Sequence, residues 1–219
     1  MRYILSNYNY DLSDPGSIPN LILQHINIVA IAMLISIAIG IPIGILVARY
    51  RWLYLPIISF TGFLYTIPSI ALVGILISIP ALGLSLATIM IPLVLYNQLV
   101  LIRNTAAGIN AVDPLLLEVG RALGMNGRQI LFRVTLPLAL PVIVAGIRLA
   151  TVTTIGIAAL ASLVGEGGLG DLIFKNISVD IDAVTAGAIL LALMAILADL
   201  LLLFIQRLLN RGRSGVSLA

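Results

Sequence analysis

Five long apolar segments alternate with short polar stretches along the chain. A transmembrane helix needs roughly 20 apolar residues to cross about 30 Å of hydrocarbon. The segments of about this length cover residues 21–48, 55–79, 84–102, 138–163 and 183–205. The pattern predicts an all-α integral membrane protein with five transmembrane helices, whose membrane domain occupies residues 21–209.

Prolines inside three of these segments predict bends in the helices. Pro42 lies in the first segment, Pro68 in the second and Pro92 in the third. Each proline lacks a backbone N–H, and neighbouring groups can satisfy the carbonyl that it frees. Gly40 and Gly44 stand one turn apart beside Pro42, so we also expect another helix to pack closely there.

Basic residues are concentrated on one side of the predicted membrane. Nine of the twelve lysines and arginines follow the first, third or fifth segment. Loops enriched in lysine and arginine remain on the cytoplasmic side of the membrane. We therefore expect the polar residues 1–20 outside the cell, residues 113–141 in the cytoplasm, and a basic cytoplasmic tail over residues 210–219.

Composition excludes several classes of protein. With 61% hydrophobic and 10% charged residues, the chain differs from soluble domains, in which about a quarter of residues are charged. It contains no cysteine and a single histidine, His25, which excludes thiolate chemistry and multi-histidine metal clusters. We expect no metal site, no cofactor bound by this chain and no nucleic-acid partner.

Neither of two nucleotide-binding signatures is expected to operate in this chain. Residues 165–170 match the string G-x-G-x-x-G, but they follow a membrane segment, whereas the dinucleotide fingerprint requires a strand before it and a helix after it. A tight outer turn is the expected structure there. The phosphate loop G-x-x-x-x-G-K-[ST] does not occur, so we do not expect this chain to be an enzyme that hydrolyses ATP.

Two charged residues lie deep inside predicted spans. Arg148 is about ten residues into the fourth segment, and Asp199 is at a similar depth in the fifth. Because an unpaired charge at this depth is costly, we expect them to form an intramembrane ion pair, either as a structural link or with a role in gating or substrate passage.

Uncharged polar residues of the second to fourth segments are candidates for lining a transport path. These candidates are Tyr65, Ser69, Tyr96, Asn97, Thr151 and Thr154. Hydrogen bonds between helices explain such residues equally well. Both interpretations stay open at this point.

The cytoplasmic residues 113–141 combine charge with helical spacing. Asp113 can cap a helix that begins at Pro114, and Gly124 and Gly127 are expected to break or end it. An apolar stripe runs along this helix through Leu115, Leu116, Val119, Leu123 and Met125. Such a helix can dock into a groove of a partner, or pack only on its own subunit.

This segment also carries a spaced motif. Its members, in order, are Glu118, Gly124, Val134, Leu136 and Pro137. They resemble the cytoplasmic loop of binding-protein-dependent ABC importer permeases of the type I family, whose consensus is Glu-Ala-Ala, three residues, Gly, nine residues, Ile, one residue, Leu-Pro. Val119 and Gly120 replace the alanines and Val134 replaces the isoleucine, which leaves the pattern recognisable.

Other segments resemble the osmoprotectant branch of that family, which imports glycine betaine, carnitine or choline. They are residues 66–69, 103–105, 136–141 and 165–171. The resemblance covers about residues 20–210 and implies a transmembrane permease in the cytoplasmic membrane of a prokaryote.

The resemblance also implies partners. In that family two permeases, a second copy or a sister chain, form the pore within membrane lipid. Two ATP-binding subunits hold ATP and Mg²⁺ beneath it, and an extracytoplasmic binding protein delivers the substrate. By position, the ATPase-coupling helix would comprise Glu118, Val119, Gly120, Arg121, Ala122, Leu123, Gly124, Met125, Asn126 and Gly127.

Two alternatives remain. The same class of importer could carry another small solute, such as the amino acid methionine. A self-contained channel or ion-coupled carrier could instead use Asp199 as its coupling carboxylate, although no further acid lies within the spans and inverted repeats are not evident.

Overall fold

The computed structural model describes residues 10–211, and every regular element among them is a helix. The remaining residues of the predicted terminal segments lie outside this range. Four helical stretches are long and apolar enough to cross a membrane. Their main helices are α1 (Ile18–Arg49), α4 (Leu86–Asn110), α7 (Leu136–Ala158) and α9 (Ile181–Arg211).

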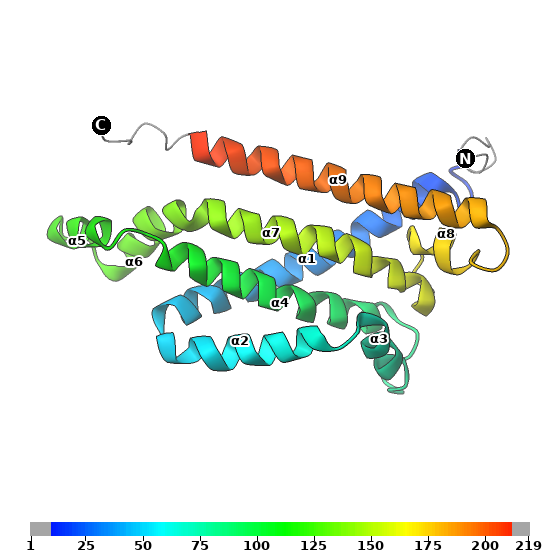
Figure 1. Ribbon diagram of the computed structural model, residues 1–219, viewed down its shortest axis with the longest axis horizontal. Coiled ribbons are helices and arrows are strands. Elements are labelled where there is room, and N and C mark those ends of the chain that lie inside the picture. Colours follow the sequence, from blue (N-terminus) through cyan, green and yellow to red (C-terminus); the bar gives the residue numbers. More distant parts are fainter. Residues whose placement is uncertain (1–9, 212–219) are drawn as a thin grey trace.

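Shorter helices lie at or between the ends of the long ones. They are α2 (Arg51–Thr66), α3 (Ser69–Ile77), α5 (Pro114–Ala122), α6 (Gly127–Ile130) and α8 (Gly170–Phe174). Figure 1 shows α5 and α6 together at one end of the molecule, with α3 and α8 at the other. The chain runs back and forth between these ends, so the start of α1 and the end of α9 lie at opposite ends.

The second predicted span is not a continuous helix. Residues 55–79 divide into α2 and α3, which meet at an angle of 83°, so the pair counts as one span only if the bend is included. Pro68 has no N–H to donate to Leu64, and it forces Ile67 into an extended conformation with ψ 126°. Pro42 and Pro92, by contrast, lie inside helices that continue past them.

The third and fourth spans are longer than predicted. α4 continues eight residues past residue 102 to Asn110, because the polar residues that follow the apolar segment include no glycine or proline before Gly108. The fourth span extends as a nearly continuous helical rod from Gly127 to Val164. Within it, residues Leu131–Thr135 form a π-helical turn just before Pro137, and Ala159–Val164 form a 3₁₀ turn.

The core of the subunit is the packing of α4 between α1 and α7. Glycines allow this approach: a Cβ atom at Gly44 would lie 2.5 Å from Cβ of Thr105, and one at Gly146 would lie 2.6 Å from Cβ of Asn104. Both distances are shorter than van der Waals contact. The close approach expected at Gly40 and Gly44 therefore occurs, and α4 is the helix that makes it.

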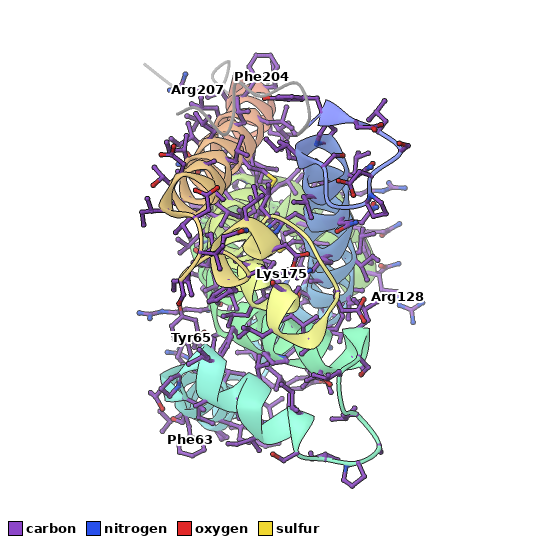
Figure 2. The ribbon with its side chains drawn as sticks, turned by 90° about the vertical axis from the view of Figure 1, so that its right-hand side faces the viewer. Phe63, Tyr65, Arg128, Lys175, Phe204 and Arg207 are labelled. Carbon is purple, nitrogen blue, oxygen red and sulfur yellow. The ribbon has the colours of Figure 1, made fainter. Side chains whose placement is uncertain are left out.

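The helices α2 and α9 lie at the periphery. Figure 2 shows α2, with Phe63 and Tyr65, and α9, with Phe204 and Arg207, at opposite sides of the molecule. A single residue, Tyr50, separates α1 from α2. These outer helices leave many apolar side chains uncovered in the isolated subunit, including Phe60, Phe63, Leu197 and Phe204.

Candidate coupling and transport sites

The predicted cytoplasmic helix is present as α5, and its start follows from the sequence. The Asp113 side chain accepts a hydrogen bond from the N–H of Leu115 at 2.9 Å. Pro114 occupies the first turn, where backbone N–H groups have no partner within the helix, so its missing N–H costs no hydrogen bond. The cap and the proline together fix where α5 begins.

α5 ends just before Gly124, one of the two glycines expected to break or end it. Gly124 takes a left-handed conformation with φ 80°, and the N–H of Met125 donates to the carbonyl of Gly120 at 3.0 Å. This is the glycine-terminated helix end known as the Schellman motif. Residues 118–127 are therefore not one helix, because α5 begins before them at Pro114 and ends within them at Ala122.

Gly127 begins a second helix and does not end the first. Asn126 caps α6 by accepting from the N–H of Gln129 at 2.9 Å, and the Gln129 side chain accepts from the N–H of Asn126 at 2.8 Å. This reciprocal capping box defines a new helix start. The start of α6 was not predicted, although Asn followed three residues later by Gln is a recognisable signal.

One side of α5 is apolar and uncovered. Its members, which we call the α5 apolar face, are Leu115, Leu116, Val119 and Leu123. Leu123 is 76% exposed. Gly120, by contrast, is buried, and a Cβ atom there would meet the side chains of Met125 and Ile130. Met125 therefore belongs to the internal packing and not to the exposed stripe.

The polar residues of the motif surround this face. Glu118, Arg121 and Arg128 lie on the same end of the molecule and are all exposed, and Arg128 points away from the helices in Figure 2. Among the described residues, none of the three takes part in an ion pair. The end of the molecule that carries α5 and α6 thus presents an apolar face bordered by charges without salt bridges.

The two intramembrane charges come together between α7 and α9. Arg148 Nε lies 2.5 Å from Asp199 Oδ1. A third residue that was not predicted, Gln206, joins them: its Oε1 accepts from Arg148 Nη1 at 3.2 Å and its Nε2 donates to the carbonyl of Pro141 at 3.0 Å. Gln206 is seven residues after Asp199, two turns along the same helix face, which could have indicated it.

This ion pair borders a cavity. A space of about 450 Å³, which we call the α7–α9 groove, is lined by Ala145, Arg148, Leu149, Val152, Ala195, Ile196, Asp199 and Leu200. The side chains of Arg148 and Asp199 are 29% and 34% exposed. The pair is therefore only partly covered by its own subunit.

Two of the predicted path residues are buried inside the subunit. Asn97 of α4 donates to Ser36 Oγ of α1 at 3.1 Å and accepts from Thr154 Oγ1 of α7 at 3.0 Å. Asn97 is 2% exposed and Thr154 is 1% exposed. These side chains tie three helices together, as the hydrogen-bonding alternative expects, and expose almost no surface in this subunit.

Two tyrosines meet at the break between α2 and α3. The hydroxyl of Tyr96, a buried residue of α4, donates to the carbonyl of Ile67 at 2.6 Å, an acceptor that the break leaves without a helical partner. The Tyr65 ring packs edge-on against it, with the centroids 5.7 Å apart. Tyr96 thus stabilises the break, while Tyr65 is exposed and Ser69 is half-buried at the start of α3.

Thr151 lies in a second, smaller groove. Its hydroxyl donates to the carbonyl of Ile147 in its own helix at 2.8 Å. The surrounding cavity of about 290 Å³ is otherwise lined by apolar side chains of α1, α7 and α9. With its hydroxyl bonded within the helix, Thr151 offers little polarity to a transported molecule.

The glycine-rich turn before α8 packs against the start of α1. Gly165, Gly167 and Gly168 all have positive φ, and the N–H of Gly168 donates to Gln24 Oε1 at 2.9 Å. A Cβ atom at Gly167 would lie 2.1 Å from the same oxygen. Close approach and positive φ account for the glycines, as expected for a tight turn and not for a nucleotide site.

His25 is more deeply placed than expected from the sequence. It is fully buried, and its Nε2 lies 3.0 Å from the carbonyl of Ile155 in α7. This contact joins α1 to the C-terminal part of α7. Over the described part of the chain, no three acidic or histidine side chains come together in a group that could hold a metal ion.

Comparisons with known proteins agree with this geometry. The family described as "Binding-protein-dependent transport system inner membrane component" matches residues 40–215. The chain is 40% identical over 202 residues to the osmoprotectant import permease protein OsmW of Salmonella typhimurium strain LT2, covering 90% of this chain and 94% of that protein.

A second relative is similarly close. The glycine betaine/carnitine/choline transport system permease protein OpuCD of Bacillus subtilis strain 168 is 40% identical over 189 residues, covering 85% of this chain and 82% of that protein.

The fold also has a solved counterpart. A chain of the inward-facing MetNI methionine ABC transporter superposes with a TM-score of 0.76 and 24% identity, covering 85% of this chain and 93% of that one. At this identity the likeness concerns the fold alone. The sequence relatives and the family match extend over most of the chain. The chain therefore belongs to the binding-protein-dependent transport system inner membrane components, as a multi-pass permease subunit of an ABC importer and not the subunit that performs catalysis.

Proposed function

We propose that this permease imports quaternary-ammonium osmoprotectants such as glycine betaine, carnitine or choline. The observation that carries the proposal is the 40% identity to permeases whose names specify osmoprotectant or glycine betaine, carnitine and choline transport, over 85–90% of this chain. The likeness to the methionine transporter is lower, at 24% identity, and concerns the fold.

The permease works in a complex. A second permease, either another copy or a sister chain, completes the pore, and two subunits that bind ATP and Mg²⁺ supply the energy. An extracytoplasmic protein binds the substrate and delivers it. The family description, which names dependence on a binding protein, supports this assembly.

The α5 apolar face is the contact for the ATP-binding subunit. An amphipathic helix docks by placing its apolar side in a groove of the partner, and α5 exposes Leu115, Leu116, Val119 and Leu123 on one side. Glu118, Arg121 and Arg128 border the contact and can pair with charges of the partner. Closure of the ATP-binding subunits would move α5. The nearly continuous helix from Gly127 to Val164, which begins with α6, would transmit that movement into the membrane.

The end of the molecule that bears α5 and α6 faces the cytoplasm in this proposal. Arginines are found on the helix ends that gather there: Arg49 ends α1, Arg51 begins α2, and Arg207 is near the end of α9. Arg121 and Arg128 belong to α5 and α6 themselves, and Figure 1 shows these helix ends at the same end of the molecule. The glycine-rich turn and α8 then lie at the outer end. The membrane domain occupies residues 21–209, and residues 1–20 begin outside.

ATP-dependent uptake tests the substrate. The permease pair, its ATP-binding subunits and its binding protein are reconstituted in liposomes, and uptake of labelled glycine betaine, carnitine, choline and methionine is measured. We expect uptake of the quaternary amines only, and only with ATP. Uptake of methionine in their place would contradict the osmoprotectant assignment, and uptake without ATP would indicate an ion-coupled carrier.

The docking role of α5 is tested by Leu123→Glu. Removing a buried leucine from an interface costs about 1.5–3 kcal/mol, so we expect the amount of ATP-binding subunit that co-purifies with the permease to fall at least tenfold. Leu84→Glu is the matched control, because Leu84 is 68% exposed and lies in the loop before α4 at the other end. Equal loss in both variants, or none in Leu123→Glu, would contradict docking through this face.

A further inference from the structure

The α7–α9 groove contains a charged pair at a depth where contact with lipid would be costly. Arg148 lies about twelve residues from the start of α7 and Asp199 about twelve from the end of α9, which is roughly 18 Å along each helix at 1.5 Å per residue. Both side chains remain about one-third exposed in the isolated subunit.

Exposure at this depth requires a polar surrounding. Charged side chains within the bilayer face the interior of a helix bundle or a water-filled cavity, because contact with hydrocarbon costs several kcal/mol. The groove must therefore open on the second permease or on the path between the two permeases. Asn97 and Thr154, two of the uncharged residues predicted to line that path, are buried and hydrogen-bonded within the subunit.

The groove has the size and chemistry of a transient substrate site. Its volume of about 450 Å³ lies within the range of roughly 300–1,000 Å³ for ligand pockets. Asp199 is the only acid within the predicted spans. Its Oδ1 is held by Arg148, whereas Oδ2 accepts no hydrogen bond from any described residue.

We propose that the α7–α9 groove opens on the translocation path and that Asp199 and Arg148 guide a quaternary-ammonium substrate through it. Asp199 Oδ2 attracts the trimethylammonium group, and the methyl-bearing side chains of Ala145, Val152 and Ala195 contact its methyl groups. Arg148 attracts the carboxylate of zwitterionic substrates such as glycine betaine and carnitine. This inference rests on the proposed function.

The arrangement suits passage more than tight binding. Quaternary ammonium groups are held firmly by cages of aromatic rings, and no aromatic residue is among those that line the groove. Conduction requires a site that is favourable enough to enter but weak enough to leave. The neutralising ion pair and aliphatic walls meet this requirement, while discrimination between substrates is left to the binding protein.

Cysteine accessibility tests the exposure of the groove without disturbing the ion pair. The chain contains no cysteine, so Ala195→Cys is introduced alone and the assembled complex in liposomes is treated with a trimethylammonium-bearing methanethiosulfonate reagent. Modification is measured as a mass shift of the permease. Leu34→Cys is the control, because Leu34 is 68% exposed near the middle of α1 and does not line the groove.

We expect the thiol of the Ala195→Cys variant to react at least tenfold faster than that of the control, and glycine betaine with its binding protein and ATP to slow the reaction. Equal rates in the two variants would overturn the inference. This readout does not depend on the natural substrate: if the wild-type complex imports no quaternary amine, the proposed function fails, whereas a water-exposed groove would still be detected.

Substitution of the pair tests its role in guidance. We expect Asp199→Asn to reduce uptake of choline and glycine betaine at least tenfold, and Asp199→Glu to restore much of it. Arg148→Gln is expected to affect glycine betaine more than choline, since choline has no carboxylate. Unchanged uptake by assembled Asp199→Asn complexes would overturn the guiding role; if that variant does not assemble, the accessibility of position 195 decides.

Discussion

The two helix contacts of α7 differ in kind. On one side α7 packs against α4, where Gly146 lies directly on Asn104, and where Asn97 and Thr154 form a fully buried hydrogen bond. On the other side it meets α9 through Arg148, Asp199 and Gln206. Arg148 and Asp199 border a groove, and all three side chains remain partly exposed. The first contact is complete within the subunit, whereas the second leaves its charged side chains partly exposed.

This difference indicates that the two contacts of α7 have different roles, one in stability and the other in transport. A dry contact that depends on small residues has little freedom to change, because interiors are close-packed. A polar contact at a groove can exchange partners with water, substrate or a second permease. Variants of the α4 side should therefore affect folding, and variants of the α9 side should affect transport.

The largest effect is expected from Gly44→Leu. A Cβ there would lie 2.5 Å from Cβ of Thr105, and separating α1 from α4 costs about 3 kcal/mol or more. We expect loss of monodisperse complex, measured by gel filtration, and a strongly lowered Tm. Gly62→Leu is the control, since nothing lies within 4 Å of a Cβ at Gly62; a similar loss there would show that the contact is not the cause.

Tyr96→Phe should have an intermediate effect. It leaves the carbonyl of Ile67 without the hydroxyl that donates to it at 2.6 Å, at a cost of about 1–3 kcal/mol if water does not replace it. The predicted readout is a lower Tm of the purified complex. Tyr65→Phe should leave Tm unchanged, because no hydrogen bond of the Tyr65 hydroxyl is present among the described residues. An unchanged Tm in both would mean that the break does not depend on this bond.

Gln206→Leu should change stability least. It removes one link to Arg148 and one to Pro141 at a partly exposed position, and interhelical hydrogen bonds in membranes average about 0.6 kcal/mol. Its buried counterpart, Asn97→Leu, should cost more, about 1–2 kcal/mol. We therefore expect a lower Tm for Asn97→Leu than for Gln206→Leu. The reverse order would contradict the proposed difference between the two contacts.

Much of the fold could be predicted from the sequence because lipid imposes length and polarity on each span. The ion pair between Arg148 and Asp199 was also predictable, since two charges of opposite sign at similar depth have few other partners. The cap at Asp113 and the end of α5 at Gly124 could be inferred from local chemistry, although the family motif alone placed the helix too late in the chain.

What could not be predicted depends on which helices meet. Asn97 and Thr154 are ordinary polar residues until α1, α4 and α7 place them against one another with Ser36. The 83° break at Pro68 likewise differs from the continuous helices at Pro42 and Pro92, and Tyr96 of another helix donates the hydrogen bond that stabilises it. Such features belong to packing, and a linear pattern does not contain them.

The one-residue connection at Tyr50 sets where foreign sequence can be added. Because α1 ends at Arg49 and α2 begins at Arg51, the two helices form a hairpin whose connection has no residues to spare for an insertion. An epitope tag or fluorescent domain inserted there would force the hairpin apart, whereas residues 78–85 join α3 to α4 without a helix of their own and offer a better place for a label.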